Sequence, residues 1–461
     1  MKRFSVTDLA AWSRGAWRTP PRQAITGFSI DTRTLQPGEL FVALKGERAN
    51  GHRFVAEAAS RGAAGAVVAS DMDNPAEETF PQLVVEDPRR ALWDIAQGHR
   101  DGIGVPLAGV TGSAGKTMVK DLLADMLGPP GEVARTPGNW NNELGLPLSL
   151  LSMRPDQRTG VFEIGMNHPG EIASLSGLLS PRWGVVTSVG AAHIAQFESE
   201  EAIAHEKAAL LEALPGDGTA IFPGDGRWSQ LLQESAPCPH LTVAVGSEAD
   251  LTAGHAPQGG PVCIRERATG ETVSIRMPVP GTFFIMDVLL AAAAARTAGA
   301  DWPLILAAVE AFSPAPLRWD VRRAGGTEVV DDSYNANPLS MKAALEAFTD
   351  MPVKGRRWLV LGAMRELGDH SDRLHRELGE CLADGSWEGV WVYGPCGEMV
   401  LNGATGNGYS FRRFHRCDTH DEIVAGLLDQ MREGDAVLIK ASRGERLDIV
   451  ASRLRKLLEK P

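Results

Sequence analysis

The sequence has few cysteines. Five are scattered through 461 residues, and no two stand in the Cys-x-x-Cys spacing of a zinc site. The scatter gives no sign of a disulfide framework and fits a reducing compartment, so we expect a cytoplasmic protein. The chain opens with MKRFSVTDLAAWSRG, which has no long apolar core, and we therefore expect no signal peptide.

Long hydrophobic runs and an excess of positive charge are also missing. The most apolar helical stretch, IMDVLLAAAAA from Ile285, is interrupted by Asp287 and is too short to cross a bilayer. Its alanines instead predict a tightly packed internal helix. The 46 Lys and Arg residues face 58 Asp and Glu, which gives a formal net charge of −12. We therefore expect no membrane insertion and no nucleic-acid partner bound through bulk charge, while local sites for anionic small molecules stay open.

The chain does contain enough apolar residues, 43% of the total, for several cores. Apolar runs alternate with helical stretches, which predicts an α/β protein of three domains. Residues 1–100 form a small α/β domain, and residues 101–316 form a central domain with a mostly parallel sheet and a strand-rich excursion over 241–279. Residues 317–461 form a second doubly wound, Rossmann-like α/β domain. The proline-rich segment 313–316 is typical of a linker between the last two.

A glycine-rich turn lies between an apolar strand and a helix-like stretch in PLAGVTGSAGKTMVK, residues 106–120. Glycines let backbone N–H groups curl around an anion, and the following helix presents its positive end to the same anion. A lysine after the turn reaches the β/γ-phosphates, and a hydroxyl next to it can ligate Mg²⁺. The turn therefore predicts a binding loop for ATP or GTP, formed by Gly112, Ser113, Ala114, Gly115, Lys116 and Thr117. A chance Gly-Lys-Thr is the alternative, and no N-K-x-D motif supports guanine binding.

Other polar residues follow predicted strands, where open parallel sheets place their ligands. The segment 137–147 is rich in asparagine, including Asn142, and amides can donate to phosphate oxygens. Glu163 ends the apolar run VFE, where a carboxylate is costly unless it is paired or metal-bound. Segment 331–338 places two acids, a tyrosine and two amides before a proline. The alternative for segment 137–147 is a simple turn, and the alternative for Glu163 is a structural ion pair. For segment 331–338 it is an Asx-type turn.

The ordered motifs resemble those of the Mur ligase family over nearly the whole chain. They are TRTLQPGELFVALKGE, TGSAGKT, GNWNNELGLP, EIGMN, AAH, a helical lysine and DDSYNANP. The DSYNANP string resembles the branch that adds D-alanyl-D-alanine to UDP-MurNAc-tripeptide in peptidoglycan synthesis. The resemblance implies an N-terminal UDP-sugar domain, a central ATPase domain and a Rossmann-like C-terminal domain that closes over the centre. A Mur-like ligase with another acyl or amine substrate, or a binding protein without turnover, is the alternative.

The resemblance also implies the chemistry and its metal ligands. ATP phosphorylates the peptide's terminal carboxylate, and the amine of the dipeptide then displaces phosphate from the acyl phosphate. Lys116 serves the phosphates, and Thr117 and Glu163 hold a first Mg²⁺. His193 and Lys207 match the second metal position, where the lysine is expected as a carbamate, because Mg²⁺ prefers oxygen ligands.

Further roles follow from the same resemblance. Asn142, Asp287, Arg318 and Asp332 are implied in nucleotide binding. Asn335 and Asn337 are implied on the dipeptide side, and Arg443 is a further basic substrate contact after the strand VLIK. The UDP end is implied to be bound by Asp31, Thr32, Arg33 and Lys45. We expect a monomer whose partners are these small molecules.

Three positions depart from the family pattern. The G-x-H-N-x-x-N helix start, whose asparagines help hold the base, reads Gly281-Thr-Phe-Phe-Ile-Met-Asp287, without the histidine or either asparagine. The LGDMxELG motif has Ala363 in place of its acid. The turn after the KGE string has Asn50 in place of an aspartate. The phosphate and metal residues are intact, so the departures concentrate on the base.

Overall fold

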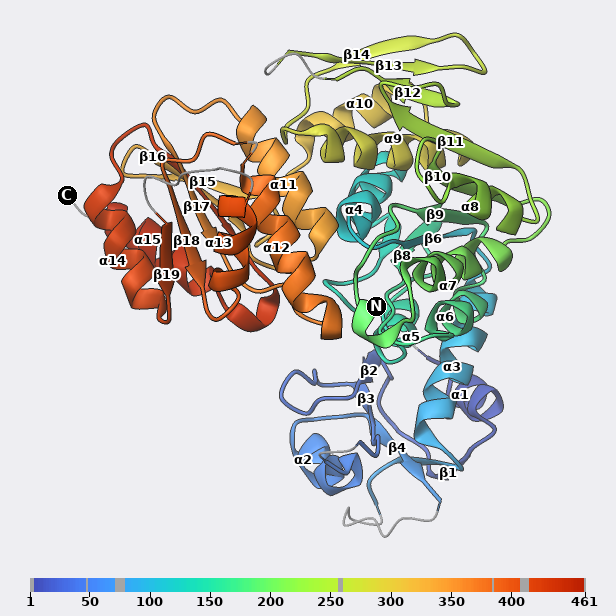
Figure 1. The fold of residues 1–461 in the computed structure, drawn as a ribbon. Helices are drawn as coiled ribbons and strands as arrows, with labels where there is room; N and C mark the ends of the chain where they lie inside the picture. The colour runs from blue at the N-terminus through green and yellow to red at the C-terminus, as the bar shows by residue number, and fades with distance from the viewer. Residues whose placement is uncertain are drawn as a thin grey trace. The chain divides into compact units, whose positions relative to one another are not determined.

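The computed structural model describes residues 4–46, 49–70, 79–255, 260–383, 385–406 and 414–459. The chain divides into two compact units (Figure 1). The first comprises residues 1–109, 128–166 and 171–182, and the second comprises 110–127, 167–170 and 183–461. Glu47 of the predicted KGE motif lies outside the described residues.

The first unit is built on a five-stranded sheet in the order β1-β5-β4-β3-β2. Strands β2 to β5 pair in parallel, and β1 pairs antiparallel with β5. The elements are α1 (Val6–Ser13), β1 (Ala16–Thr19), β2 (Gly27–Ser29), β3 (Glu39–Val42), η1 (Gly51–Phe54), α2 (Val55–Ser60), β4 (Gly65–Ala69), β5 (Gln82–Val85) and α3 (Pro88–Ile103). The small α/β unit predicted for the N-terminal segment is therefore present.

The first unit also holds elements that follow the phosphate loop in sequence. They are β7 (Val133–Arg135), α5 (Gly145–Leu151), β8 (Thr159–Glu163) and α6 (Glu171–Leu179). Helix α3 is tied to the segment before α5, because the Trp93 indole donates to the Glu143 carbonyl at 2.7 Å. Arg89 forms an ion pair with the Glu143 carboxylate. The expected boundary at residue 100 falls inside α3, and the domain limits stay predictions.

The central sheet has nine strands in the order β14-β13-β12-β11-β10-β9-β6-β8-β7. Its remaining strands are β6 (Leu107–Thr111), β9 (Trp183–Val186), β10 (Thr219–Pro223), β11 (His240–Val245), β12 (Leu251–Ala253), β13 (Val262–Glu266) and β14 (Thr272–Ile275). Strands β9 to β12 pair in parallel, whereas β13 and β14 turn back antiparallel. The predicted strand-rich excursion over 241–279 is thus an extension of the sheet.

Helices of the second unit position the candidate site. Those that follow the central strands are α4 (Lys116–Leu127), η2 (Ile194–Gln196), α7 (Glu200–Glu212), α8 (Ser229–Ser235), α9 (Thr282–Thr297) and α10 (Trp302–Ala311). Eleven of the sixteen residues of α9 are buried, including the run Ala291–Ala295, whose small side chains allow close packing. The prediction of an internal helix is confirmed. No described helix has the length and apolar character needed to cross a membrane.

The C-terminal sheet has six strands in the order β15-β16-β20-β17-β18-β19, and only β15 is antiparallel. The elements are β15 (Asp320–Ala324), β16 (Thr327–Asp332), α11 (Pro338–Asp350), β17 (Arg357–Leu361), η3 (Gly368–His370), α12 (Ser371–Leu382), β18 (Gly389–Tyr393), α13 (Gly397–Gly406), β19 (Phe414–Cys417), α14 (His420–Gln430), β20 (Ala436–Lys440), η4 (Arg443–Glu445) and α15 (Asp448–Leu458). Helices α11, α12 and α13 lie on one face, and α14 and α15 lie on the other (Figure 1). This is the doubly wound arrangement predicted from the sequence.

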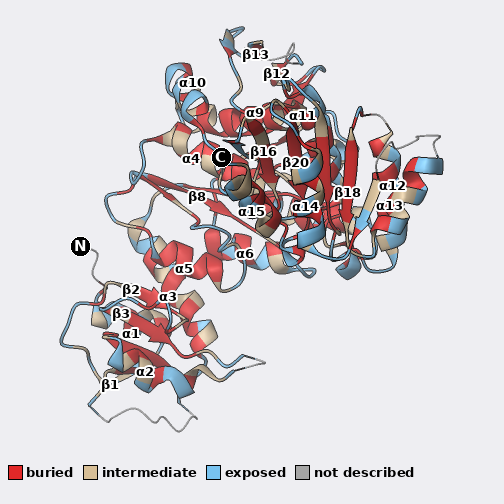
Figure 2. Cartoon of the chain, turned by 90° about the vertical axis from the view of Figure 1, so that its left-hand side faces the viewer, coloured by how far each residue is buried: buried red, intermediate tan, exposed pale blue. Residues whose placement is uncertain are grey.

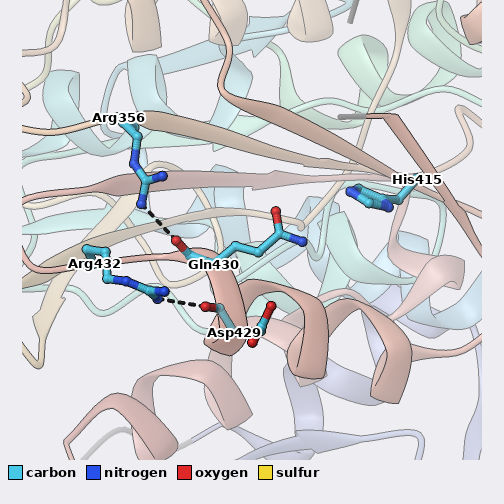
Figure 3. Close-up of a pocket in the computed structure, with 5 residues that line it drawn as sticks. All are labelled: Arg356, His415, Asp429, Gln430 and Arg432. Atoms are coloured by element: carbon cyan, nitrogen blue, oxygen red, sulfur yellow. Dashed lines mark hydrogen bonds between the residues drawn. The ribbon is translucent and has the colours of Figure 1, made fainter. Parts of the chain in front are cut away.

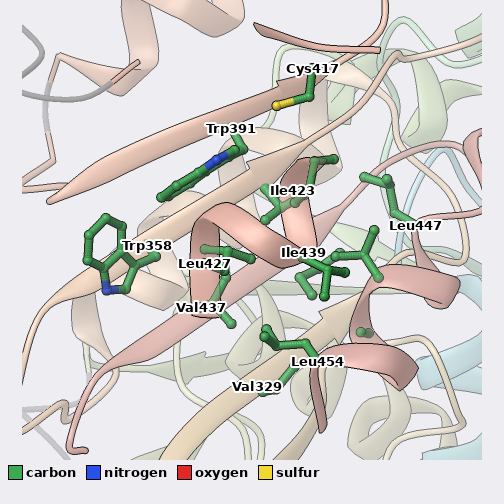
Figure 4. Packing of buried hydrophobic residues seen from close by; sticks show 14 of the residues in the cluster. Val329, Trp358, Trp391, Cys417, Ile423, Leu427, Val437, Ile439, Leu447 and Leu454 are labelled. Atoms are coloured by element: carbon green, nitrogen blue, oxygen red, sulfur yellow. The ribbon is translucent and has the colours of Figure 1, made fainter. Parts of the chain in front are cut away.

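Buried strands give this sheet a rigid base. Figure 2 shows β18 and β20 as mostly buried, and every residue of β20 is buried. On the face of the sheet that α14 and α15 cover, buried residues form one apolar cluster around Trp358 and Trp391. The ring centroids of these two residues are 5.3 Å apart (Figure 4). Polar residues at the strand ends therefore project from a fixed scaffold.

Candidate active site

The predicted phosphate loop connects β6 to α4, which begins at Lys116. Gly112 and Gly115 adopt positive φ values of 153° and 82°, which side-chain-bearing residues rarely adopt. A Cβ at Gly112 would overlap Thr187, and a Cβ at Gly115 would overlap Asp287. The strand, turn and helix predicted from the sequence are therefore present in that order.

The loop is held by the segment that follows β9. The Ser113 amide donates to the Ser188 carbonyl, and the Ala114 amide donates to the Ser188 hydroxyl, both at 2.9 Å. The Ser113 hydroxyl donates to the Gly190 carbonyl at 2.9 Å. Lys116 Nζ donates to the Gly112 carbonyl at 2.7 Å, so the lysine lies along the loop. Thr117 is buried at the start of α4.

Asp287 of α9 lies against the loop at Gly115. The side chain is 95% buried, and its Oδ2 atom has no hydrogen-bond partner among the described residues. Burial raises the pKa of the Asp287 carboxyl well above its ordinary value, since nothing offsets the cost of charging it there. The structure thus places Asp287 beside the phosphate loop.

Lys207 of α7 is 99% buried. Burial is the main cause that holds the pKa of its amine well below the ordinary value, and the positive charge of Lys116 adds to that effect. The opposing influence of Glu206 is smaller. The sequence pattern of this helical lysine is that of a surface residue, whereas the structure buries it near the phosphate-loop lysine, where burial favours its neutral form.

His193 adopts a left-handed backbone conformation, with φ of 59°, just before η2. Its Nδ1 atom lies 2.5 Å from a carboxylate oxygen of Glu366, and the Glu366 carbonyl accepts from the Ala195 amide at 3.1 Å. The hydrogen bond with His193 lowers the pKa of the Glu366 carboxyl. Glu366 belongs to the LGAMRELG segment, so this segment contacts the residue predicted at the second metal position.

Glu163, in the first unit, ends β8 and is 99% buried. Its Oε1 atom accepts from the Asn141 side chain at 2.7 Å, and its amide donates to the Thr136 hydroxyl at 2.9 Å. The Asn141 bond orients the carboxylate, and the Thr136 bond holds the backbone of Glu163. The Asn142 side-chain oxygen accepts from the Gly145 amide at 2.9 Å, at the start of α5. Its role with the nucleotide stays a prediction.

The polar loop after β16 is organised by a lysine that the sequence analysis did not single out. Lys440 Nζ, at the end of β20, lies 2.7 Å from Asp332 Oδ2 and donates to the Asn335 carbonyl at 3.1 Å. Asp332 also accepts from the Trp319 amide at 3.2 Å. The Arg318 guanidinium stacks on the Tyr334 ring, with its carbon 3.9 Å from the centroid. The two predicted nucleotide contacts, Arg318 and Asp332, thus flank one loop.

Within the second unit, this polar loop contacts the phosphate loop. The Asn337 side-chain amide donates to the Ser113 carbonyl at 2.9 Å, while its oxygen accepts from the Ser340 amide and caps α11. Asn335 is exposed and accepts from the Ala336 amide. Arg443 pairs with Asp448 at 2.9 Å. Of the three predicted substrate contacts, only Asn337 is bound to the phosphate loop.

The predicted UDP-end residues lie in the first unit. The Arg33 guanidinium holds Asp31 at 2.5 Å and, as the main cause, lowers the pKa of that carboxyl to about 2. Thr32 is buried. The backbone of Lys45 forms an isolated β-bridge with that of Asn50. The Asn50 side-chain oxygen accepts a hydrogen bond from the His52 amide at 3.1 Å. The four residues are described, and their substrate role stays a prediction.

A separate open pocket of about 600 Å³ lies at the other edge of the C-terminal sheet (Figure 3). It is lined by Arg356, His415, Asp429, Gln430 and Arg432. Arg356 precedes β17, and Arg432 precedes β20, so the pocket is at the amino ends of these parallel strands. Open α/β sheets bind ligands at the carboxyl ends, where Asp332 and Lys440 lie. The pocket is therefore not part of the candidate site.

Sequence reasoning missed three partners of the site: Glu366, Ser188 and Lys440. Lys440 carried a usable signal, because it ends the apolar run AVLIK as Glu163 ends VFE. Glu366 lies in the LGAMRELG motif but was not assigned a role, and Ser188 has no local signal.

The donor chemistry suits Mg²⁺ completed by a nucleotide. Among the described residues, no three His, Cys, Asp or Glu side chains form a group that could hold a metal alone. Mg²⁺ in nucleotide sites is normally bound by one or two carboxylates together with substrate phosphates and water. The buried carboxylate of Glu163 and the buried hydroxyl of Thr117 are donors of that kind.

Comparison with known families agrees with this geometry. Residues 24–100 match the model described as Mur ligase family, catalytic domain, and residues 110–295 match the Mur ligase middle domain. Residues 317–443 match the model described as Mur ligase, glutamate ligase domain. The chain belongs to the Mur ligase family, and the predicted fold class and family are confirmed.

Individual relatives share one printed name, UDP-N-acetylmuramoyl-tripeptide--D-alanyl-D-alanine ligase. The protein of Bacillus subtilis is 32% identical over 469 residues, which cover 100% of both chains. That of Escherichia coli is 36% identical over 357 residues, 76% of this chain and 77% of its own. A crystal structure of MurF from Acinetobacter baumannii has a TM-score of 0.88 and 27% identity, covering 99% of each chain. MurF from Thermotoga maritima in complex with ADP has a TM-score of 0.81 and 28% identity, covering 94% of this chain and 98% of its own.

Proposed function

We propose that this chain is an ATP-dependent peptide ligase that joins D-alanyl-D-alanine to UDP-MurNAc-tripeptide in peptidoglycan precursor synthesis. The observation that carries the proposal is the contact between the phosphate loop and the DSYNANP segment, made by Asn337 and the Ser113 carbonyl. It joins the triphosphate motif to the motif that sets this branch of the family apart. The relatives that bear this enzyme's name span the full chain.

The proposed reaction has two steps. The γ-phosphoryl group of ATP passes to the terminal carboxylate of the tripeptide, which gives an acyl phosphate and ADP. The dipeptide amine then attacks the acyl carbon, loses a proton, and phosphate leaves as the amide forms. A carboxylate is a poor electrophile, so phosphorylation supplies the leaving group. The protein's contribution is then mainly positioning and neutralisation of charge around the transferred group.

Residue roles follow from the contacts. Lys116 supplies positive charge at the phosphates, with the start of α4 behind it. Glu163 and Thr117 would hold Mg²⁺, which would neutralise charge that develops on the phosphoryl oxygens. Asn141 orients the Glu163 carboxylate, and Thr136 holds the Glu163 backbone. Arg318, stacked on Tyr334, presents its guanidinium next to the loop that carries Asp332.

A carbamate on Lys207 is part of the proposal. Only a neutral amine attacks CO₂, and burial near Lys116 favours the neutral form of Lys207 because it lowers the pKa of that amine. Carbamylation would convert this amine into an anionic oxygen ligand near the charge of Lys116. His193 and the Lys207 carbamate would hold the second Mg²⁺. His193 would then either lose its contact with Glu366 or keep it while binding the metal.

Turnover assays test the proposal directly. Phosphate release should require both UDP-MurNAc-tripeptide and D-Ala-D-Ala, and mass spectrometry should show the pentapeptide product. ATP consumption that ignores both substrates would overturn the assignment and would favour a ligase with another acyl or amine substrate.

Lys116→Ala should reduce phosphate release by at least about 100-fold, because one preorganised charge at a transferring group has an effect of this size. Lys342→Ala, on the exposed face of α11, is the matched control and should leave the rate unchanged. Equal rates for wild type and Lys116→Ala would mean that the loop does not serve catalysis.

A further inference from the structure

The most unusual group near the phosphate loop is the carboxyl of Asp287. It projects from the second turn of α9 and occupies the space where a side chain at Gly115 would lie. Gly115 immediately precedes Lys116, so the carboxyl is next to the part of the loop that serves the phosphates. Sequence comparison had suggested a role with the base, whereas the contact is with the loop.

The surroundings of this carboxyl contain nothing to compensate a negative charge. Oδ2 is buried without a hydrogen-bond partner among the described residues, and the whole side chain is 95% buried. Among the described elements, α9 packs against α4, β9 to β12, α10 and α11. Burial is the single cause that shifts the pKa of the Asp287 carboxyl, so no charged group on those elements contributes to the shift. An isolated buried carboxylate is far more costly than a buried carboxylic acid.

A neutral carboxylic acid can do what a carboxylate cannot. It carries one O–H donor and retains acceptor capacity, whereas the ionised form only accepts. Next to a loop that receives phosphates of charge opposite to that of Lys116, an anion would repel the ligand. A neutral acid supplies instead a hydrogen for a phosphate oxygen or a loop carbonyl.

We propose that Asp287 is a positioning residue of the phosphate loop and works as a neutral acid, its carboxyl supporting the backbone at Gly115 and donating a hydrogen bond when nucleotide phosphates bind. The inference rests on the proposed use of ATP but not on the identity of the peptide or the dipeptide. It assigns a role that the sequence motif alone does not give.

The matched pair of variants is Asp287→Asn and Asp287→Leu, whose side chains both branch at Cγ. Asparagine keeps a donor and an acceptor without charge, whereas leucine keeps only the shape. Calorimetric titration of the full-length protein with ADP and Mg²⁺ at pH 7 should give an affinity for Asp287→Asn within about threefold of wild type. Asp287→Leu should bind at least about tenfold more weakly, since one lost hydrogen bond at a charged ligand is worth about that factor.

The pH profile separates positioning by a neutral acid from a merely structural role. Between pH 7 and 9.5, the affinity of wild type should stay level with that of Asp287→Asn until the carboxyl ionises and should then fall below it, because ionisation places a negative charge beside the phosphates. Titration of Lys116 and of ADP affects both proteins equally, so it cancels in the ratio of their affinities for ADP. If Asp287→Leu does not fold, this ratio still tests the inference.

Three results would overturn the proposal. An affinity more than tenfold lower for Asp287→Asn at pH 7 would show that a carboxylate is required. Equal affinities for wild type, Asp287→Asn and Asp287→Leu would show that the group has no positioning role. A wild-type affinity that rises with pH relative to that of Asp287→Asn would exclude the neutral acid, because the carboxylate would then be the better binding form. Failure of wild type to bind any ADP would instead overturn the proposed function, and the inference with it.

Discussion

Among the described residues, three lysines are almost completely buried, Lys120, Lys207 and Lys440, and the surroundings of the last two differ. Lys440, 3% exposed, lies between the Asp332 carboxylate and the Asn335 carbonyl and holds the loop that follows β16. Lys207, 1% exposed, lies near Lys116, and burial holds the pKa of its amine well below the ordinary value. Lys440 is paired with a carboxylate and holds a loop, whereas Lys207 is buried near another lysine. Burial alone therefore does not reveal a lysine's role, and the charge of the neighbouring groups is needed as well.

The largest effect should come from Lys207→Arg. A guanidinium cannot shed its proton, so the change forces a permanent charge into a buried place beside Lys116. We expect a loss of about 4 kcal/mol in the free energy of unfolding, because burial penalises a permanent charge at this position, and no measurable ligase turnover. Urea unfolding and phosphate release measure the two effects. Lys207→Met is the matched control: it should stay folded while losing turnover, because it removes the amine without adding charge.

Equal stability of Lys207→Arg and wild type would contradict the contrast between the two lysines. It would mean that the site near Lys207 accepts positive charge. The parallel change Lys440→Arg should cost only about 1 kcal/mol, because an arginine still pairs with Asp332.

The second effect should come from Lys440→Met. It leaves the Asp332 carboxylate without its cation at the end of β16, and breaking a pair of this kind costs about 3 kcal/mol. The double variant Lys440→Met, Asp332→Asn should recover much of that loss, since it also removes the unpaired charge. Urea unfolding of the three proteins measures the coupling between the two residues. Additive losses in the double variant would show that the pair does not stabilise the loop.

The third effect concerns the link between the two loops. Asn337→Ala removes an N-cap from α11 and the donor to the Ser113 carbonyl. Loss of the cap should cost about 1 kcal/mol, and loss of the contact should raise the KM for ATP more than it lowers kcat. Thr419→Ala, which removes the cap of α14 alone, is the control for the capping term. Identical kinetics for Asn337→Ala and wild type would separate the phosphate loop from the DSYNANP segment.

The sequence predicted the fold well because its signals are local. Alternating apolar runs, the glycine turn before Lys116 and the alanine-rich helix after Gly281 each act within a few neighbouring residues. Glu163 was identifiable for the same reason, since a charge ends a buried strand. Lys440 ends a strand in the same way, and consistent use of that rule would have found it.

Contacts between distant segments could not be read in this way. Asn337 and Ser113 are 224 positions apart, and His193 meets Glu366 across a comparable distance in sequence. The Asp287 contact with Gly115 depends on how α9 packs against α4, which no local pattern encodes. The predicted role of Asp287 with the base followed from a motif position, whereas its position in space is beside the phosphate loop.

The smallest effect concerns an exposed ion pair, which can be compared with the buried lysines Lys207 and Lys440. Asp31 pairs with Arg33 in the first unit, but most of the Arg33 side chain is in water, so screening makes such a pair worth little at neutral pH. The pKa of Asp31 is lowered to about 2, with the Arg33 hydrogen bond as the main cause. Stability from this pair is therefore present above the unfolded value of 3.8 and is lost as the pH falls through about 2. Asp31→Asn should match wild type in urea unfolding within about 0.5 kcal/mol at pH 7, and any difference should disappear by pH 2. A larger loss at pH 7, near that of Lys440→Met, would mean that the contrast between buried and exposed charges does not govern this protein.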